Sequence, residues 1–245
     1  MDIQSISNLP PTIRLYNQTP YAQEATAMVL YAEDNIAIFD KTIFYAESGG
    51  QVSDIGWVGD NAVIDVQKRL GEFHSVKNKN ISVPTVKINT RIIHTFTNSV
   101  DFHVGDIVEM KINWERRYKI MKHHTLSHFL FHAIDNFFKE NNFDMFLKGC
   151  TIDEEKATFS LNNAISDEQF EQIKRSVECT FNHSIPIYMY PEETTDEIFY
   201  WAANDIVIPC GGTHIASTQE IDTAFYIGKK SGGKNKTKLY IKLIA

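Results

Sequence analysis

The sequence predicts an α+β protein in which an N-terminal small β-barrel domain is followed by an α+β two-layer domain. Short β-rich runs separated by turn residues fill the first half, and a helical pattern of apolar residues begins after Trp114. Two alternating apolar runs then close the chain. Because hairpin chemistry gives way to helical periodicity near residue 112, we predict domains at residues 1–112 and 113–245.

The expected strands of the first domain are short and are separated by turn signals. Between them stand Asp34-Asn35 and Gly59-Asp60-Asn61, which favour tight hairpins. Many short strands with frequent turns are typical of a small barrel. The runs lie at residues 27–31, 36–40, 57–58, 62–66 and 107–112.

The second domain opens with a long helix, expected at about residues 115–140. Leu126, Leu130, Ala133 and Phe137 recur at steps of three or four within a stretch that lacks Gly and Pro. The remaining elements are expected as a strand at 157–161, a helix capped near Ser166 and ending near Asn182, a strand at 185–190, a helix near 192–202, and a hairpin pairing 222–227 with 238–244.

Composition excludes several classes of protein. With 245 residues, 43% hydrophobic and 22% charged, the chain has the usage of an ordinary globular protein. No apolar run reaches the roughly 20 residues of a membrane span, and no secretory layout precedes Pro11, so we expect a cytoplasmic protein. The odd cysteine count (Cys150, Cys179, Cys210) disfavours a disulfide framework and leaves thiols for metal binding.

The formal net charge of −7 argues against general nucleic-acid coating, although a basic patch lies near the C-terminus. A solvated strand edge protected by lysines and an RNA contact are equally good readings of this patch. Its lysines are Lys229, Lys230, Lys234, Lys236, Lys238 and Lys242.

Two motifs carry potential metal ligands. His124 and His128 are four apart on the expected helix, so their imidazoles can share one ion. Cys210 and His214 flank two glycines and offer a thiolate and a third imidazole, a donor set suited to zinc. The alternative is a chance histidine pair with a buried, inert cysteine, which requires two independent coincidences.

The sequence leaves the state of this metal site open. Four protein ligands would make it structural, whereas catalysis needs one position for water or substrate. If one ligand is loose, His214 is the candidate. A further motif, Gly49-Gly50-Gln51, can bring backbone N–H groups and a carboxamide to a polar substrate, but a simple β-turn is the favoured interpretation.

Taken together, these motifs resemble the editing domain of alanyl-tRNA synthetases and the free-standing AlaX-type editing proteins. The matching stretches are FYAESGGQVSDIG at 44–56, VGDIVEMKINWERRYKIMKHHTLSHFL at 104–130 and PCGGTHIASTQE at 209–220. The resemblance implies a barrel, an α+β editing domain, a Zn²⁺ ion and hydrolysis of serine or glycine from mischarged tRNA(Ala). One departure is Leu147-Lys148-Gly149-Cys150, where synthetase relatives carry a more polar stretch, so a substrate contact from position 147 is in doubt.

The resemblance also suggests roles for individual residues. Thr125 would hydrogen-bond the hydroxyl of serine, against the alternative of a helix residue bonding its own backbone. Gln51 would position the tRNA terminus or a water. Phosphates would be bound by Arg116 and Arg117 with Lys230, Lys234 and Lys236. Two rivals share the metal chemistry: a zinc hydrolase of small esters or amides, and a zinc-stabilised tRNA-binding module without turnover.

Overall fold

The computed structural model describes residues 3–76, 86–181, 184–193 and 195–244. The chain forms two compact units. The first comprises Met1–Arg117, Met189–Tyr200 and Pro209–Thr213, and the second comprises Tyr118–Tyr188, Trp201–Ile208 and His214–Ala245. Arg117 belongs to the first unit, where its guanidinium bonds Asp54 and Ile43, and the predicted domain boundary near residue 112 stays a prediction. The two late segments that belong to the first unit have no local signal in the sequence.

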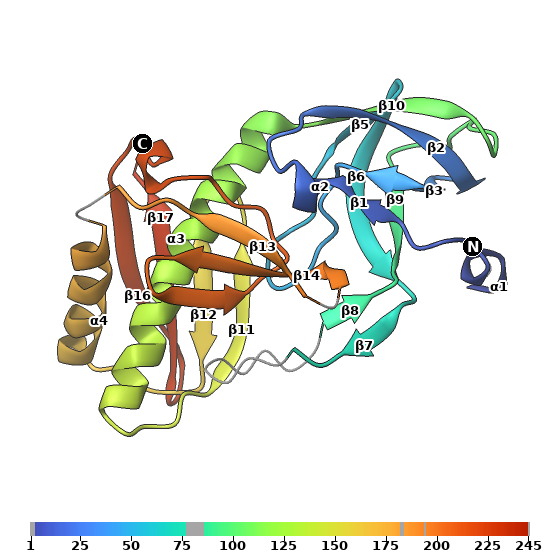
Figure 1. Ribbon diagram of the computed structural model, residues 1–245. Coiled ribbons are helices and arrows are strands. Elements are labelled where there is room, and N and C mark those ends of the chain that lie inside the picture. The colour runs from blue at the N-terminus through green and yellow to red at the C-terminus, as the bar shows by residue number, and fades with distance from the viewer. Residues whose placement is uncertain (1–2, 77–85, 182–183, 194, 245) are drawn as a thin grey trace. The chain divides into compact units, whose positions relative to one another are not determined.

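In the first unit, the described strands include a sheet that closes into a barrel (Figure 1). Its hydrogen-bonded order is β10 (Ile107–Ile112), β2 (Glu24–Glu33), β3 (Ile36–Phe39), β9 (Arg91–Phe96), β6 (Asn61–Arg69) and β5 (Gly56–Val58). Every strand expected in this half is present. Asp34 and Gly59 take φ values of 52° and 53°, the left-handed backbone that tight hairpins between twisted strands require.

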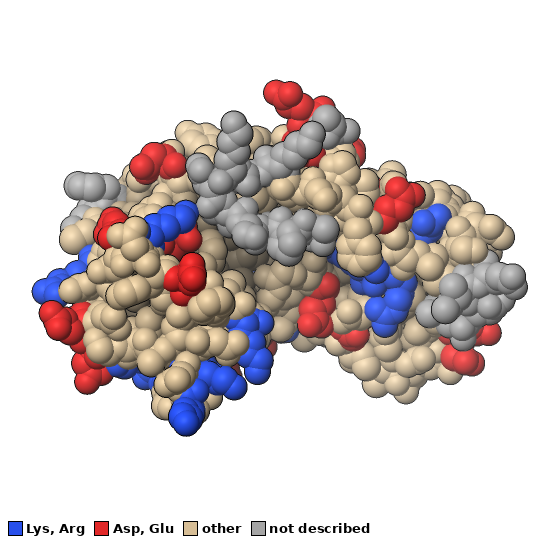
Figure 2. Space-filling view, turned by 90° about the horizontal axis from the view of Figure 1, so that it is seen from below, with Lys and Arg blue, Asp and Glu red and all other residues tan. Residues whose placement is uncertain are grey.

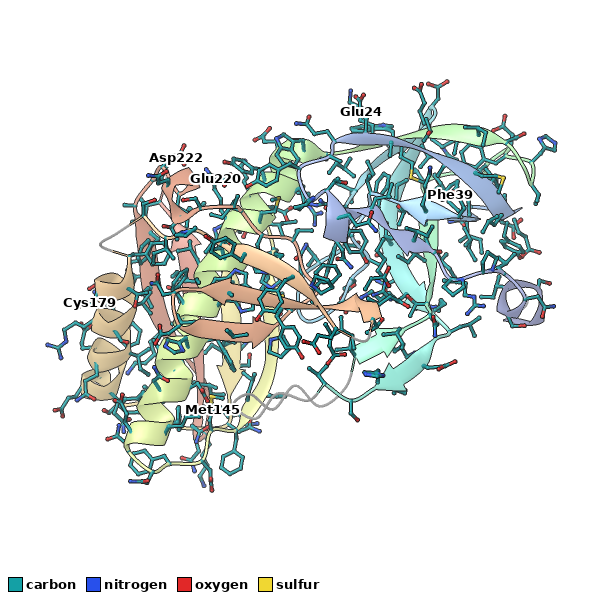
Figure 3. All side chains as sticks on the ribbon, in the orientation of Figure 1. Glu24, Phe39, Met145, Cys179, Glu220 and Asp222 are labelled. Carbon is teal, nitrogen blue, oxygen red and sulfur yellow. The ribbon has the colours of Figure 1, made fainter. Side chains whose placement is uncertain are left out.

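The barrel encloses an apolar core. Val29, Phe39, Val66 and Ile92 are completely buried, and Figure 3 labels Phe39 among the side chains of the barrel. Along β5 the burial alternates, since Trp57 is exposed between buried Gly56 and Val58. Around the barrel lie α1 (Ile3–Ser7), β1 (Ile13–Arg14), α2 (Leu15–Gln18), β4 (Lys41–Thr42), β7 (Glu72–His74) and β8 (Val86–Ile88).

The second unit contains a sheet with the strand order β11 (Leu147–Ile152), β12 (Ala157–Leu161), β17 (Lys236–Leu243) and β16 (Phe225–Gly233). The expected C-terminal hairpin is confirmed as β16–β17, with longer strands than predicted. Helix α3 (Trp114–Glu140) matches its predicted range within one residue, and Leu126, Leu130, Ala133 and Phe137 are all buried.

Helices α3 and α4 (Asp167–Thr180) pack on one face of this sheet. Phe131 of α3 stacks near Phe159 of β12, with ring centroids 5.7 Å apart. From β16, the Lys229 ammonium lies 5.7 Å from the Phe170 ring of α4. Ser166 caps α4 in a complete capping box, as predicted, whereas the predicted end near Asn182 lies outside the described residues. No helix in the described ranges is long and apolar enough to span a membrane.

The helix predicted near residues 192–202 is wrong. That region forms β14 (Thr195–Ala203), between β13 (Tyr188–Glu192) and β15 (Ile206–Pro209), and a short 3₁₀ turn, η1 (Thr218–Glu220), follows. Phe199, Trp201 and Ala203 are buried at every second position, which is the spacing of a strand. Aromatic and β-branched residues in this segment favour the extended backbone over the predicted helix.

Candidate metal centre

Helix α3 brings two imidazoles together on one face. His124 and His128 are four residues apart, and their ring centroids lie 5.0 Å apart in a stacked arrangement. Both side chains are buried. Trp201 packs against the other side of His128, with ring centroids 4.8 Å apart. A rigid helix and an aromatic wall therefore fix the direction in which both rings point.

A third imidazole joins them from the far end of the sequence. The His214 ring lies 4.1 Å from that of His124 and 4.8 Å from that of His128, measured between centroids. Its Nδ1 is 3.1 Å from the hydroxyl of Thr125. Metal-bound histidines commonly use their second ring nitrogen in such a bond, which fixes the tautomer and leaves the other nitrogen for the ion.

Cys210 completes the predicted set. The ligand atoms of His124, His128, Cys210 and His214 all lie within 4.8 Å of one another, so the four residues could hold a metal ion. The thiol sulfur of Cys210 accepts a hydrogen bond of 3.3 Å from the backbone N–H of Gly212. The turn at Gly211-Gly212 thus already presents a positive dipole to the sulfur, which favours the thiolate.

The electrostatics of the group suit a cation. Burial lowers the pKa of His124 to about 3 and those of His128 and His214 well below the usual value, so all three rings are neutral and able to act as ligands. Nε2 of His128 is buried and has no hydrogen-bond partner among the described residues. Burying an imidazole nitrogen without a partner costs free energy. A metal ion bound at this nitrogen would supply the missing partner.

Burial shifts the pKa of the Cys210 thiol in the opposite direction to those of the three histidines. Burial raises its pKa to about 12, although the Gly212 N–H and the Lys68 ammonium both act to lower it. In the absence of a cation the sulfur therefore keeps its proton. Because a coordinated thiol is deprotonated outright, binding of an ion at Cys210 would release a proton.

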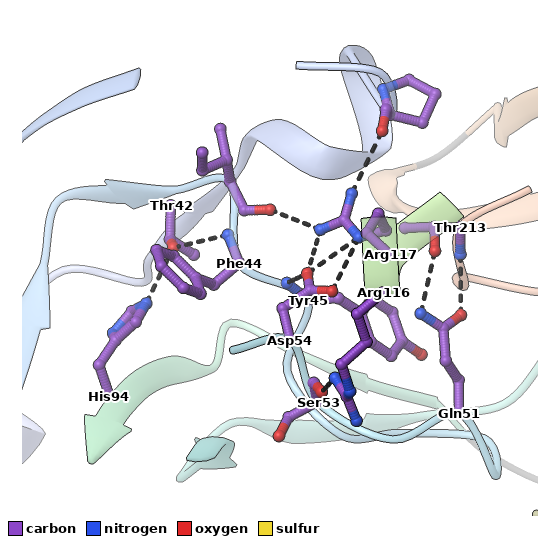
Figure 4. Close-up of polar contacts among 12 residues, drawn as sticks. Thr42, Phe44, Tyr45, Gln51, Ser53, Asp54, His94, Arg116, Arg117 and Thr213 are labelled. Carbon is purple, nitrogen blue, oxygen red and sulfur yellow. Dashed lines mark hydrogen bonds and ion pairs between the residues drawn. The ribbon is translucent and has the colours of Figure 1, made fainter. Parts of the chain in front are cut away.

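Gln51 is bound to the residue that precedes His214. Its side-chain nitrogen donates to the Thr213 hydroxyl over 2.9 Å, and its side-chain oxygen accepts from the Thr213 backbone N–H over 3.0 Å (Figure 4). Gln51 is completely buried, and Gly49 and Gly50 have positive φ values of 61° and 90° in the turn before it. The glycines thus form the expected turn, and the carboxamide fixes the backbone of the Cys210–His214 motif.

The prediction that Arg117 binds phosphate is wrong. Its guanidinium is fully buried, forms an ion pair with Asp54 and donates to the carbonyl of Ile43 over 2.8 Å (Figure 4). Each of its three nitrogens donates to a group inside the protein, and Nη1 donates to the carbonyl of Pro20. Arg116 is half-buried and donates to the carbonyl of Ser53 over 2.7 Å, and its phosphate contact stays a prediction.

The three lysines predicted to contact RNA are exposed. Lys230 lies on β16, Lys236 begins β17, and Lys234 lies in the turn between them. Sequence reasoning missed Trp201, which packs against His128, and Thr213, which hydrogen-bonds Gln51. It also missed Asp54, which pairs with the buried guanidinium of Arg117. The Thr213 contact could have been suspected, because a Gly-Gly-Gln turn needs a partner for a buried carboxamide.

The fold and this cluster define a class: α+β proteins with a closed-barrel unit and a buried Cys/His₃ group able to hold a metal ion. Comparisons with known proteins narrow the class. Residues 13–116 match the family model of class II (A) tRNA synthetases. The alanyl-tRNA editing protein AlaX-M of Pyrococcus horikoshii is 30% identical over 236 residues, which cover 93% of this chain and 96% of that protein.

Alanine–tRNA ligases are also similar, over a smaller share of their length. The ligase of Methanococcus aeolicus is 26% identical and that of Sulfurisphaera tokodaii 29% identical, each over 89% of this chain. The chain spans only 24% and 25% of these two ligases. The chain belongs to the family of alanyl-tRNA editing proteins, and the resemblance read from its motifs is confirmed.

Proposed function

We propose that the chain is a hydrolase that removes serine or glycine from mischarged tRNA(Ala). The observation that carries this proposal is the convergence of His124, His128 and His214 with Cys210 in a chain that is similar to an editing protein over almost its whole length. That relative is named as an alanyl-tRNA editing protein. The serine and glycine substrates are our inference from the residues described below.

The donor set supports zinc as the bound ion. Three neutral imidazoles and one thiol are borderline and soft ligands, which Zn²⁺ prefers over the oxygen ligands of Mg²⁺ or Ca²⁺. A zinc ion held by these four residues would supply a Lewis acid for ester hydrolysis. In that reaction a water adds to the carbonyl carbon, the bond to the ribose oxygen breaks, and that oxygen takes up a proton.

Thr125 is the residue proposed to read the amino acid. Its hydroxyl is buried beside His214, so it can hydrogen-bond the hydroxyl of serine while it holds the imidazole. A buried polar group that pairs with a substrate hydroxyl rejects the analogue that lacks it, which here is alanine. Glycine would be admitted by its small size.

Gln51 is proposed as a positioning residue. Both ends of its carboxamide bind Thr213, so the tRNA terminus does not need to meet Gln51 directly. Its effect on hydrolysis would come through the backbone that carries Cys210 and His214. This differs from direct binding of the tRNA terminus or a water, the role that the sequence suggested.

A structural zinc site is the alternative that one observation favours. Four protein ligands can fill a tetrahedral shell and leave no position for water. The protein would then bind tRNA without turnover. The two proposals differ in a single assay, because only the hydrolase releases amino acid.

The test uses tRNA(Ala) charged separately with radiolabelled serine, glycine and alanine. We expect release of serine and glycine at rates far above the spontaneous rate, and little release of alanine. Treatment with a chelator should stop the reaction and added Zn²⁺ should restore it. Equal activity on small aminoacyl esters would favour a general esterase, and no release from any tRNA would support the structural role.

A further inference from the structure

The outer face of the second unit's sheet carries a basic surface. On it, Lys230 pairs with Lys238 across β16 and β17, and Lys238 pairs with Ser160 of β12. Residues directly opposite in an antiparallel sheet point to the same face. The residues between them in each strand point to the opposite face of the sheet. On that face Phe159 and Leu239 are buried beneath the helices. The lysines therefore share the face that α3 and α4 leave open.

Edge protection does not explain the lysines of β17. In the sheet order β11-β12-β17-β16, β17 is an inner strand, yet it carries Lys236, Lys238 and Lys242, all exposed. Lysines that blunt a sheet edge belong on edge strands. Like charges directly opposite, as at Lys230 and Lys238, destabilise a sheet, and a bound anion would offset that cost. Figure 2 shows Lys and Arg side chains gathered along the lower margin of its left-hand part.

A pocket of about 240 Å³ opens in this surface. Its charged lining is entirely basic, contributed by Lys148, Lys236 and Lys238, and its polar lining offers hydroxyl and amide groups. These groups belong to Thr151, Ser160 and Asn162. Ammonium, hydroxyl and amide donors around a cavity of this size suit a phosphate group.

Two tyrosines lie beside the lysines. The Tyr240 ring lies over Gly228, where an added Cβ would come within 2.2 Å of the ring, and Lys230 lies 5.4 Å from its centroid. Tyr226 is 46% exposed, with its ring centroid 6.0 Å from that of Tyr240. Exposed aromatic rings next to basic groups provide stacking surfaces for nucleotide bases.

From this arrangement we propose that the outer basic face binds the phosphate backbone of RNA. We define the outer basic face by Lys148, Lys230, Lys236, Lys238, Tyr226 and Tyr240. A phosphodiester would occupy the pocket, and a neighbouring base would stack on a tyrosine. The proposal rests on the proposed function in one respect, namely that RNA rather than another polyanion is the partner.

The experiment compares two variants with equal loss of charge. One carries Lys148→Gln, Lys236→Gln and Lys238→Gln on the outer basic face. The control carries Lys139→Gln, Lys174→Gln and Arg175→Gln, which lie on α3 and α4. Binding of fluorescently labelled, uncharged tRNA(Ala) is measured by anisotropy at several salt concentrations, and thermal denaturation checks folding.

We expect the outer-face variant to bind tRNA at least about tenfold more weakly at 0.1 M salt, because each phosphate contact contributes through counterion release. Its plot of log K against log salt should be shallower by about 2 to 3 units. The control should bind like the wild type. In deacylation assays the outer-face variant should show a higher KM with unchanged kcat.

The outcomes separate this proposal from the proposed function. If the wild type binds tRNA but releases no amino acid, the hydrolase proposal fails. The proposal that the outer basic face binds RNA is then unaffected. If the outer-face variant binds tRNA as tightly as the wild type, the proposed RNA binding by the outer basic face is refuted, even when deacylation is normal. Binding to vesicles containing phosphatidylserine but not to tRNA would also overturn it, in favour of a membrane partner.

Discussion

Gln51 and Thr213 are 162 residues apart in the chain, yet they share two hydrogen bonds of 2.9 Å and 3.0 Å. The two glycines before Gln51 take φ values of 61° and 90°, a left-handed backbone that turns the carboxamide toward its partner at no steric cost. Because Thr213 immediately precedes His214, this pair of bonds holds the backbone next to a residue of the candidate metal site. A carboxamide far away in sequence thus fixes a ligand-bearing loop.

Replacing Gln51 with Leu should loosen that loop. The variant leaves the backbone N–H of Thr213 buried without its partner, so we expect a loss of about 1–3 kcal/mol in the free energy of unfolding. Zinc affinity should fall as well. Gln23→Leu, at an exposed position, is the control. Urea denaturation and zinc titration measure both effects, and wild-type values for the Gln51 variant would rule out a positioning role.

Substitution of Arg117 should affect stability far more than substitution of Arg116. Removing the buried guanidinium in Arg117→Ala leaves the Asp54 carboxylate buried and unpaired, which costs about 3–5 kcal/mol. Arg116→Ala removes a half-buried contact to one carbonyl and should cost about 1 kcal/mol. Denaturation curves of the two variants make the comparison. Equal losses would show that the buried ion pair with Asp54 does not set the stability of this region.

Replacing His128 with Gln should remove the metal. The imidazole belongs to the four-residue cluster, and its Nε2 is buried without a hydrogen-bond partner among the described residues. His132 lies one turn further along α3 and is half-exposed, so His132→Gln is a matched control. Elemental analysis should find close to one zinc per chain in the wild type and the control, and little in the His128 variant. Full zinc in that variant would exclude His128 as a ligand.

The hydroxyl of Thr125 should matter for both metal and substrate. Thr125→Val removes the partner of His214 Nδ1, and loss of such a supporting bond typically weakens metal affinity by about 10- to 100-fold. The same variant should attack correctly charged alanyl-tRNA more readily. Thr125→Ser keeps a hydroxyl and should retain both properties. With zinc held at saturation, unchanged discrimination in the valine variant would leave Thr125 with a structural role alone.

Stability should fall in acid because of His94 in the barrel. Burial lowers its pKa from 6.5 to about 3, while its Nε2 lies 2.8 Å from the hydroxyl of Thr42. Between these pH values the unfolded chain binds a proton that the folded chain does not. The free energy of unfolding therefore decreases as pH falls, by at most ~1.4 kcal/mol per pH unit from this group.

The corresponding comparison uses His94→Gln and His103→Gln. His103 is exposed and serves as the control. Denaturation of metal-free protein between pH 7 and pH 4 should show a shallower loss of stability in the His94 variant, whatever its absolute stability. Identical slopes in the two variants would contradict the assignment.

Local spacing was sufficient to predict several elements. The helix over residues 115–140 and the capping role of Ser166 follow from periodicity and capping chemistry, which act within a few residues. The strand at residues 195–203 was not predictable in this way. A helix was predicted near residues 192–202, whereas burial of Phe199 and Trp201 in the folded chain selects a strand.

The sequence by itself determined which side chains can act as a metal-binding group, because the four-residue spacing of His124 and His128 on a helix and the ligand chemistry of Cys210 are local properties. Only the tertiary structure decided that Arg117 is buried while its neighbour Arg116 is half-exposed, and that Gln51 binds Thr213. These pairings join segments that are more than 60 residues apart in the chain. A local sequence pattern does not specify which distant residue packs against a given side chain.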